Sequence, residues 1–135
     1  MALMPKIEYE NAQASVREVY DDIRATRKND YINDIWKVLA NDPALLKRSW
    51  EQTKTVMSPG AIDGLTKEFI YLAVSMTNNC EYCINTHTAA ARSKGMTDAQ
   101  FGELLSVVGL ANQMNRLAVG TQTEVDAKIR ALRYP

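Results

Sequence analysis

The feature that most constrains the fold is an apolar spacing of three and four residues that recurs along the chain. Its first occurrence falls within residues 11–27 and consists of Val16, Val19, Tyr20 and Ile23. This spacing places all its members on one face of a helix. No convincing run alternates apolar and polar residues, as a half-buried strand would require. The sequence therefore predicts an all-α fold.

Turn and cap signals divide the rest of the chain into further helices. We expect these helices over about residues 32–39, 43–57, 63–77, 80–95 and 97–118, with a short last helix from residue 123. Asp42 and Asp63 are suited to cap the helices that follow them, and Pro43 suits a first helical turn. Together these segments predict a bundle of about six to seven helices, with residues 1–135 as a single domain.

Composition excludes several classes of protein. The 135 residues are 46% apolar, which is enough for a packed core without a disulfide staple. The 16 basic and 16 acidic residues balance, so no net field attracts nucleic acid or an acidic membrane surface. The longest apolar runs are far shorter than the roughly 20 residues of a membrane span. The first residues lack the pattern of a secretory signal, so we expect a cytoplasmic protein.

Both cysteines and the only histidine fall within eight residues, as Cys80, Cys83 and His87. In a reducing cytoplasm, a C-x-x-C pair is more often catalytic or metal-binding than structural. A structural bridge across one helical turn would add little rigidity. Zinc ligands usually lie on loops or knuckles, so a triplet carried by one helix is an unusual zinc site, even with Glu68 as a fourth ligand.

Glu68 occupies an apolar face, where a carboxylate is costly unless it is paired. The stripe around it consists of Leu65, Phe69, Leu72, Ala73 and Met76. Because the turn at Asn78 and Asn79 is very short, the flanking helices should pack as an antiparallel hairpin. Glu68 lies ten residues before that turn and His87 eight after it, at nearly equal depth. We therefore expect these two side chains to meet, although a buried salt bridge from Glu68 to Arg92 or Arg116 is an alternative.

This arrangement suits redox catalysis by thiols. A thiolate is the reactive form of cysteine, and the first turn of a helix favours an anion. His87 can accept a proton from a thiol, and Glu68 can orient and stabilise the resulting imidazolium. After one sulfur is oxidised to a sulfenic acid, the second sulfur can condense with it to a disulfide.

These residues resemble the alkylhydroperoxidase AhpD-like family within the carboxymuconolactone decarboxylase superfamily. The shared pattern is E-x11-C-x-x-C-x-x-x-H, matched by Glu68, Cys80, Cys83 and His87. Segments 41–46, 79–91 and 95–100 are also similar to family segments, and the likeness covers about residues 36–112. The resemblance implies an all-helical fold whose active site lies on the helical hairpin, and assembly into homotrimers or homohexamers.

The resemblance also implies roles for individual residues. Cys83 would attack the hydroperoxide, Cys80 would resolve the sulfenic acid, and His87 with Glu68 would relay protons. The implied enzyme needs no bound cofactor, and an external dithiol, such as a lipoylated protein, would reduce its disulfide. The family's best-known member has a histidine where this chain has Tyr82, which makes Tyr82 a candidate auxiliary residue. The decarboxylase branch generally lacks the cysteine pair, so its lactone chemistry fits poorly.

The leading hypothesis is therefore a thiol-dependent peroxidase that acts on hydroperoxides. One alternative is a thiol–disulfide oxidoreductase without peroxidase activity. Another is a non-enzymatic metal-binding or redox-sensing module. A member of the superfamily that acts on a different small molecule is a further alternative that the sequence leaves open.

Overall fold

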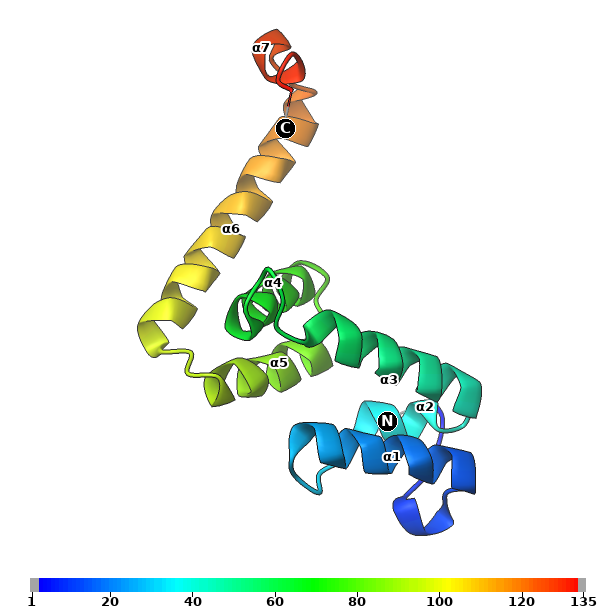
Figure 1. The fold of residues 1–135 in the computed structure, drawn as a ribbon. Helices are drawn as coiled ribbons and strands as arrows, with labels where there is room; N and C mark the ends of the chain where they lie inside the picture. The colour runs from blue at the N-terminus through cyan, green and yellow to red at the C-terminus, as the bar shows by residue number, and fades with distance from the viewer. Residues whose placement is uncertain (1–2, 134–135) are drawn as a thin grey trace. The chain divides into compact units, whose positions relative to one another are not determined.

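The computed structural model describes residues 3–133, and every regular element in that range is helical (Figure 1). The elements are a 3-10 turn η1 (Tyr9–Asn11) and the α-helices α1 (Ala14–Arg27), α2 (Asp34–Leu39), α3 (Pro43–Met57), α4 (Gly64–Thr77), α5 (Glu81–Ser93), α6 (Asp98–Thr121) and α7 (Ala127–Arg130). The all-α prediction is confirmed. Among the described helices, none combines the length and the apolar character that a membrane span requires.

Local capping explains why most helices begin where the sequence predicts. The Asp42 side chain accepts hydrogen bonds from the first turn of α3, and Asp63 accepts one from the Thr66 N–H at the start of α4. Thr97 and Gln100 form a reciprocal capping box at the start of α6. These side chains satisfy backbone N–H groups that the helices themselves leave unpaired.

Three predicted boundaries are wrong, namely two helix starts and the end of α6, which continues to Thr121 rather than about residue 118. The first helix begins at Ala14, not near residue 11, because η1 forms a separate turn and Ala12 adopts an extended conformation. Ala12 is itself buried in the core, so tertiary packing overrides helical continuity there. The last helix begins at Ala127, four residues later than expected, with Asp126 as its N-cap residue.

The chain divides into two compact units, one ending at Ser58 and the other beginning at Pro59. The prediction of a single domain over residues 1–135 stays a prediction. In the first unit, α1 and α2 both pack against α3. Its core includes Tyr20, Ile23 and Leu46. The rings of Trp36 and Trp50 meet edge to face, with their centroids 5.5 Å apart.

In the second unit, α4 packs against both α5 and α6. Its core consists of Leu72, Ala91 and Met96, with partly buried side chains around them. The helix α5 ends at Ser93, and Gly95 lies just after its C-cap residue Lys94 with a φ of +94°, which suits a residue without a Cβ atom. The N–H groups of Gly95 and Met96 bond back to the carbonyls of Arg92 and Ala91, which is the hydrogen-bond pattern of a Schellman motif.

We predict that Leu46→Ala lowers the free energy of unfolding of the first unit by about 2–5 kcal/mol, because the change leaves a cavity in a packed core. Leu46 is 0% exposed, whereas Leu3 in the same unit is fully exposed. The matched variant Leu3→Ala should therefore change stability by less than about 0.5 kcal/mol. Urea unfolding followed by tryptophan fluorescence measures both. Equal effects of the two variants would contradict this core assignment.

Candidate active site

The helices α4 and α5 run antiparallel, as three contacts along their length show. Next to the turn, the Cys80 N–H donates to the Ser75 carbonyl at 3.0 Å. Halfway along, Glu68 meets His87. At the far end, the Lys94 side chain lies over Gly64, where an added Cβ atom would stand 3.5 Å from Lys94 Cε. The hairpin register expected from the sequence is therefore present.

Glu68 and His87 form a short hydrogen bond inside this hairpin. His87 Nδ1 lies 2.7 Å from Glu68 Oε2, and Glu68 is only 3% exposed. When Nδ1 carries the proton, it donates to the carboxylate and leaves Nε2 as the basic nitrogen. The contact thus fixes both the orientation of the imidazole ring and the nitrogen that can accept a proton.

Lys94 binds the other oxygen of Glu68, with its Nζ 2.7 Å from Oε1. The sequence suggested Arg92 or Arg116 as an alternative ion-pair partner for Glu68, and the Arg92 alternative is wrong. Arg92 instead pairs with Asp98 at 2.6 Å and donates to the Met96 carbonyl. The signal for Lys94 was present in the sequence, because residues 80, 83, 87 and 94 follow one helical stripe.

The charge state of Glu68 follows from two opposing effects. Burial by itself would raise the pKa of this carboxyl, because desolvation disfavours the anion. The hydrogen bonds from His87 and Lys94 and the Lys94 charge outweigh burial and lower the pKa below its ordinary value. Glu68 is therefore a carboxylate at neutral pH.

A tyrosine that the sequence interpretation missed covers the imidazole. The rings of Tyr71 and His87 are stacked, with centroids 3.5 Å apart and planes 18° from parallel. Tyr71 lies on α4 three residues after Glu68, so both side chains reach the same part of α5. The imidazole is thus held at its edge by Glu68 and on its face by Tyr71.

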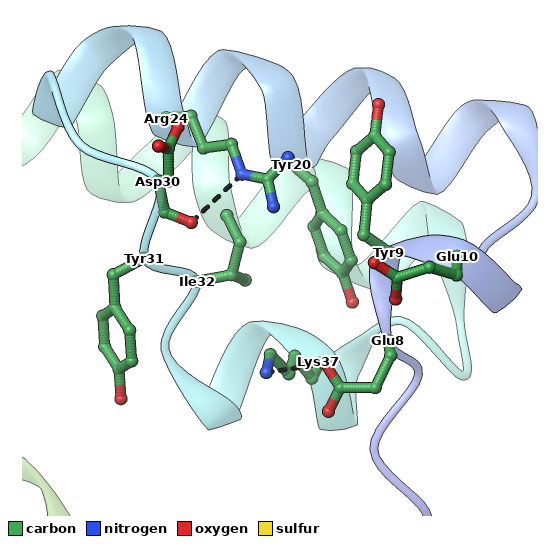
Figure 2. A pocket seen from close by; sticks show the side chains of 9 residues that line it. All are labelled: Glu8, Tyr9, Glu10, Tyr20, Arg24, Asp30, Tyr31, Ile32 and Lys37. Atoms are coloured by element: carbon green, nitrogen blue, oxygen red, sulfur yellow. Dashed lines mark hydrogen bonds and ion pairs between the residues drawn. The ribbon is translucent and has the colours of Figure 1, made fainter.

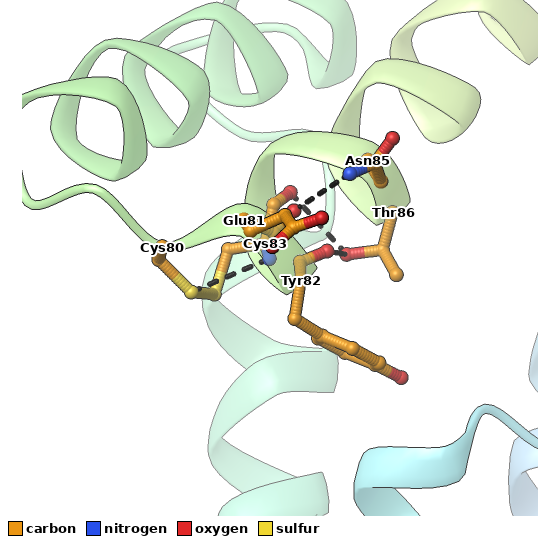
Figure 3. The surroundings of a disulfide bond; sticks show 6 residues. All are labelled: Cys80, Glu81, Tyr82, Cys83, Asn85 and Thr86. Atoms are coloured by element: carbon orange, nitrogen blue, oxygen red, sulfur yellow. Dashed lines mark hydrogen bonds between the residues drawn. A yellow bond between two sulfur atoms is a disulfide. The ribbon is translucent and has the colours of Figure 1, made fainter. Parts of the chain in front are cut away.

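Cys80 and Cys83 are joined by a disulfide at the start of α5 (Figure 3). Cys80 is the N-cap residue of this helix, and its Sγ atom accepts the Cys83 N–H at 3.3 Å. Both cysteines are half-buried. The exposed Tyr82 side chain points away from the two sulfurs in Figure 3. The structure therefore brings Glu68 to His87 and joins the two thiols, but it does not bring the Tyr82 ring to the sulfurs.

Other parts of the described chain offer less chemistry. Within residues 3–133, no three Cys, His, Asp or Glu side chains are grouped so that they could hold a metal ion. A pocket in the first unit contains neither cysteine nor histidine (Figure 2). It is lined by Glu8, Tyr9, Glu10, Tyr20, Arg24, Asp30, Tyr31, Ile32 and Lys37. Two of its charged groups form an ion pair, Lys37 with Glu8 at 2.8 Å.

Comparison with known proteins identifies a family and a solved structure that this chain resembles. The model of the carboxymuconolactone decarboxylase family matches residues 43–122. The crystal structure of the alkylhydroperoxidase AhpD core from Rhodospirillum rubrum is similar with a TM-score of 0.94 and 52% sequence identity, over 98% of this chain and 99% of that chain.

Two curated proteins are similar over shorter stretches. "Uncharacterized protein 4 in cox locus" of Paracoccus denitrificans is 38% identical over 55 residues, which are 41% of this chain and 50% of that protein. An alkyl hydroperoxide reductase of Mycobacterium tuberculosis is 26% identical over 104 residues, which are 77% of this chain and 30% of that protein. The chain thus matches half or less of the length of these curated relatives.

The lowered pKa of Glu68 predicts how stability depends on pH. Since the folded-state pKa lies below the unfolded one, ionised Glu68 stabilises the fold above the unfolded pKa of about 4.3. This stabilisation is lost as the pH falls through the folded-state pKa. We expect Glu68→Gln to cost about 1–3 kcal/mol near pH 7 and progressively less below pH 4. Urea unfolding of both proteins from pH 3 to 7 measures this difference, and a constant difference over that range would contradict the prediction.

Proposed function

The chain belongs to the carboxymuconolactone decarboxylase family, as one of its AhpD-like members, and from this premise we propose that it is a thiol-dependent peroxidase that reduces hydroperoxides. One observation carries the proposal: a disulfide-bonded cysteine pair begins the same helix that holds His87 against a buried carboxylate. A passive disulfide clip would need neither the imidazole nor its carboxylate partner.

In the proposed cycle, the Cys83 thiolate attacks the distal oxygen of a hydroperoxide, and the O–O bond breaks. The products are a Cys83 sulfenic acid and, after protonation, an alcohol or water. Cys80 then attacks the Cys83 sulfur, which forms the disulfide and releases water. An external dithiol reduces the disulfide, so the net reaction consumes one hydroperoxide and one dithiol and yields an alcohol, water and the oxidised dithiol.

The helix supplies two of the requirements for this chemistry. Both sulfurs lie in the first turn of α5, where the helix dipole stabilises a thiolate. His87 lies one turn after Cys83 on the same face. With Nδ1 held by Glu68, its Nε2 accepts the thiol proton and later returns it to the leaving oxygen, directly or through water. We assign the attack to Cys83 because it is the thiol nearer His87 in the sequence and because the family pattern gives it that role.

The reductant in this proposal is a dithiol, such as the lipoyl group of a partner protein, and the chain itself needs no bound cofactor. A dithiol suits the reaction because it closes its own disulfide after exchange and so releases the enzyme. A reducing compartment such as the cytoplasm keeps this dithiol reduced. No part of the cycle requires a nucleic acid or a membrane.

We also propose that the chain works as a homo-oligomer, a trimer or hexamer as the family resemblance implies. No residue of α6 is buried, and its apolar stripe is at least half exposed: Val107, Leu110, Met114 and Leu117. This stripe lies on the opposite face from Asn112, which donates to Thr77 of α4 at 3.0 Å. The three-four spacing suits packing against a helix of a second copy.

The first functional prediction concerns the cysteines. We expect wild-type protein to reduce tert-butyl hydroperoxide with dihydrolipoamide as reductant, and Cys83→Ser to lose this activity because it lacks the attacking sulfur. Cys80→Ser should still consume one equivalent of peroxide and accumulate a sulfenic acid, which dimedone traps and mass spectrometry detects.

Three outcomes of this assay would contradict the proposal. Full activity of Cys83→Ser would disprove the assigned mechanism. Wild-type protein that is inert to peroxide with any dithiol would disprove the function. Rapid oxidation of the reduced protein by a disulfide, but not by peroxide, would instead support a thiol–disulfide oxidoreductase.

The second functional prediction concerns assembly. The double variant Leu110→Glu with Met114→Glu should reduce the molar mass measured by light scattering, because it places charges in the proposed interface. Asn115→Glu changes an exposed residue outside the stripe on the same helix and should leave the mass unchanged. A wild-type protein that is monomeric at micromolar concentration would contradict the assembly proposal.

A further inference from the structure

The Lys94 ammonium group contacts the carboxylate of the proposed relay. Its Nζ lies 2.7 Å from Glu68 Oε1, while His87 occupies Oε2 at the same distance. The carboxylate is 4% exposed and the Lys94 side chain 40% exposed. Glu68 is therefore shared between an ammonium group and an imidazole.

The position of Lys94 is defined by the fold. Lys94 is the C-cap residue of α5, and its aliphatic stem lies over Gly64 at the start of α4, where a larger residue would meet it. The ammonium group is also placed favourably with respect to the negative end of the helix dipole. The fold thus holds the Lys94 ammonium group close to Glu68.

This placement affects the proton affinity of His87. A carboxylate with no other partner strongly favours the protonated imidazolium, which cannot accept a proton from a thiol. A carboxylate that is already neutralised by a lysine still accepts the Nδ1 proton of a neutral imidazole, but it attracts the second proton less. Tyr71 also faces His87, with its ring stacked on the imidazole.

We propose that Lys94 is a positioning residue of the site: by neutralising Glu68, it lets Glu68 orient His87 without keeping His87 protonated. The proposal rests on the proposed peroxidase function for its catalytic meaning. Lys94 itself touches neither sulfur nor peroxide in this scheme and acts only through Glu68.

The test uses the fact that His87 is the only histidine of the chain, so its imidazole signal in NMR needs no assignment. The full-length protein is reduced, and the His87 signal is followed from pH 4 to 9. Lys94→Met removes the charge and keeps most of the stem, whereas Lys94→Arg keeps the charge. Lys128→Met, at an exposed lysine of α7, is the matched control. Circular dichroism verifies that each variant is folded.

We expect the midpoint of the His87 titration to rise by about one pH unit in Lys94→Met, because a full neighbouring charge changes proton affinity by about that much or more. Lys94→Arg and Lys128→Met should leave the midpoint where wild-type protein has it. An unchanged or lowered midpoint in folded Lys94→Met would overturn the proposal. A shift of equal size when Lys94→Met is made in the Glu68→Gln background would also overturn it, since Lys94 would then act without Glu68.

A kinetic measurement separates this inference from the proposed function. If the chain is a peroxidase, the acid limb of its kcat/KM profile against pH should shift to higher pH in Lys94→Met. The shift should equal that of the His87 midpoint in NMR, because His87 must be neutral to accept the thiol proton. A merely structural role would lower the rate at every pH without moving that limb. If wild-type protein lacks peroxidase activity, the proposed function fails, and the NMR titration alone decides the role of Lys94.

Discussion

The buried carboxylate of Glu68 is the constraint on which the site depends. A charge with 3% exposure is tolerable only when nearly all its hydrogen-bonding capacity is used. Here one oxygen binds an imidazole and the other an ammonium group, both from the facing helix. These two contacts couple α4 to α5 at a defined register, because a shift of either helix by one residue would break both. The geometry of the candidate site and the packing of the hairpin therefore depend on the same two contacts.

The hairpin keeps the register that the two Glu68 contacts require because both of its ends are well defined. Asn79 adopts a left-handed conformation in the turn, and the adjacent Cys80 N–H bonds back to α4. At the other end, Gly95 stops α5 directly after Lys94. The cysteines, the histidine and the lysine thus lie along one stripe of a helix of fixed length. The cysteines lie at its positive end, where the helix dipole would favour a thiolate, and the lysine lies at its negative end, where the dipole favours a cation.

Much of this could be predicted from the sequence, because the relevant signals are local. Cap residues located most helix boundaries, and equal depth on either side of a short turn paired Glu68 with His87. The partner of Glu68 was harder to predict, since Arg92 and Lys94 are both basic and only two residues apart. Side chains on a helix lean toward its N-terminus, so Lys94 reaches back toward Glu68, whereas Arg92 is held by Asp98 at the next helix. Tyr71 was missed because ring stacking leaves no periodic signal.

Energetics also favour a chemical role for the trio of Glu68, His87 and Lys94. Removing one member of a buried ionic cluster is costly, because the others lose their partner. Replacing a whole cluster by well-packed apolar residues is often neutral or stabilising. The hairpin already has an apolar core around Leu72 and Ala91, which could extend over these positions. Stability alone therefore gives no reason for an imidazole, a carboxylate and an ammonium group to meet on a hairpin whose second helix begins with a cysteine pair, whereas the proposed proton transfer to and from sulfur would.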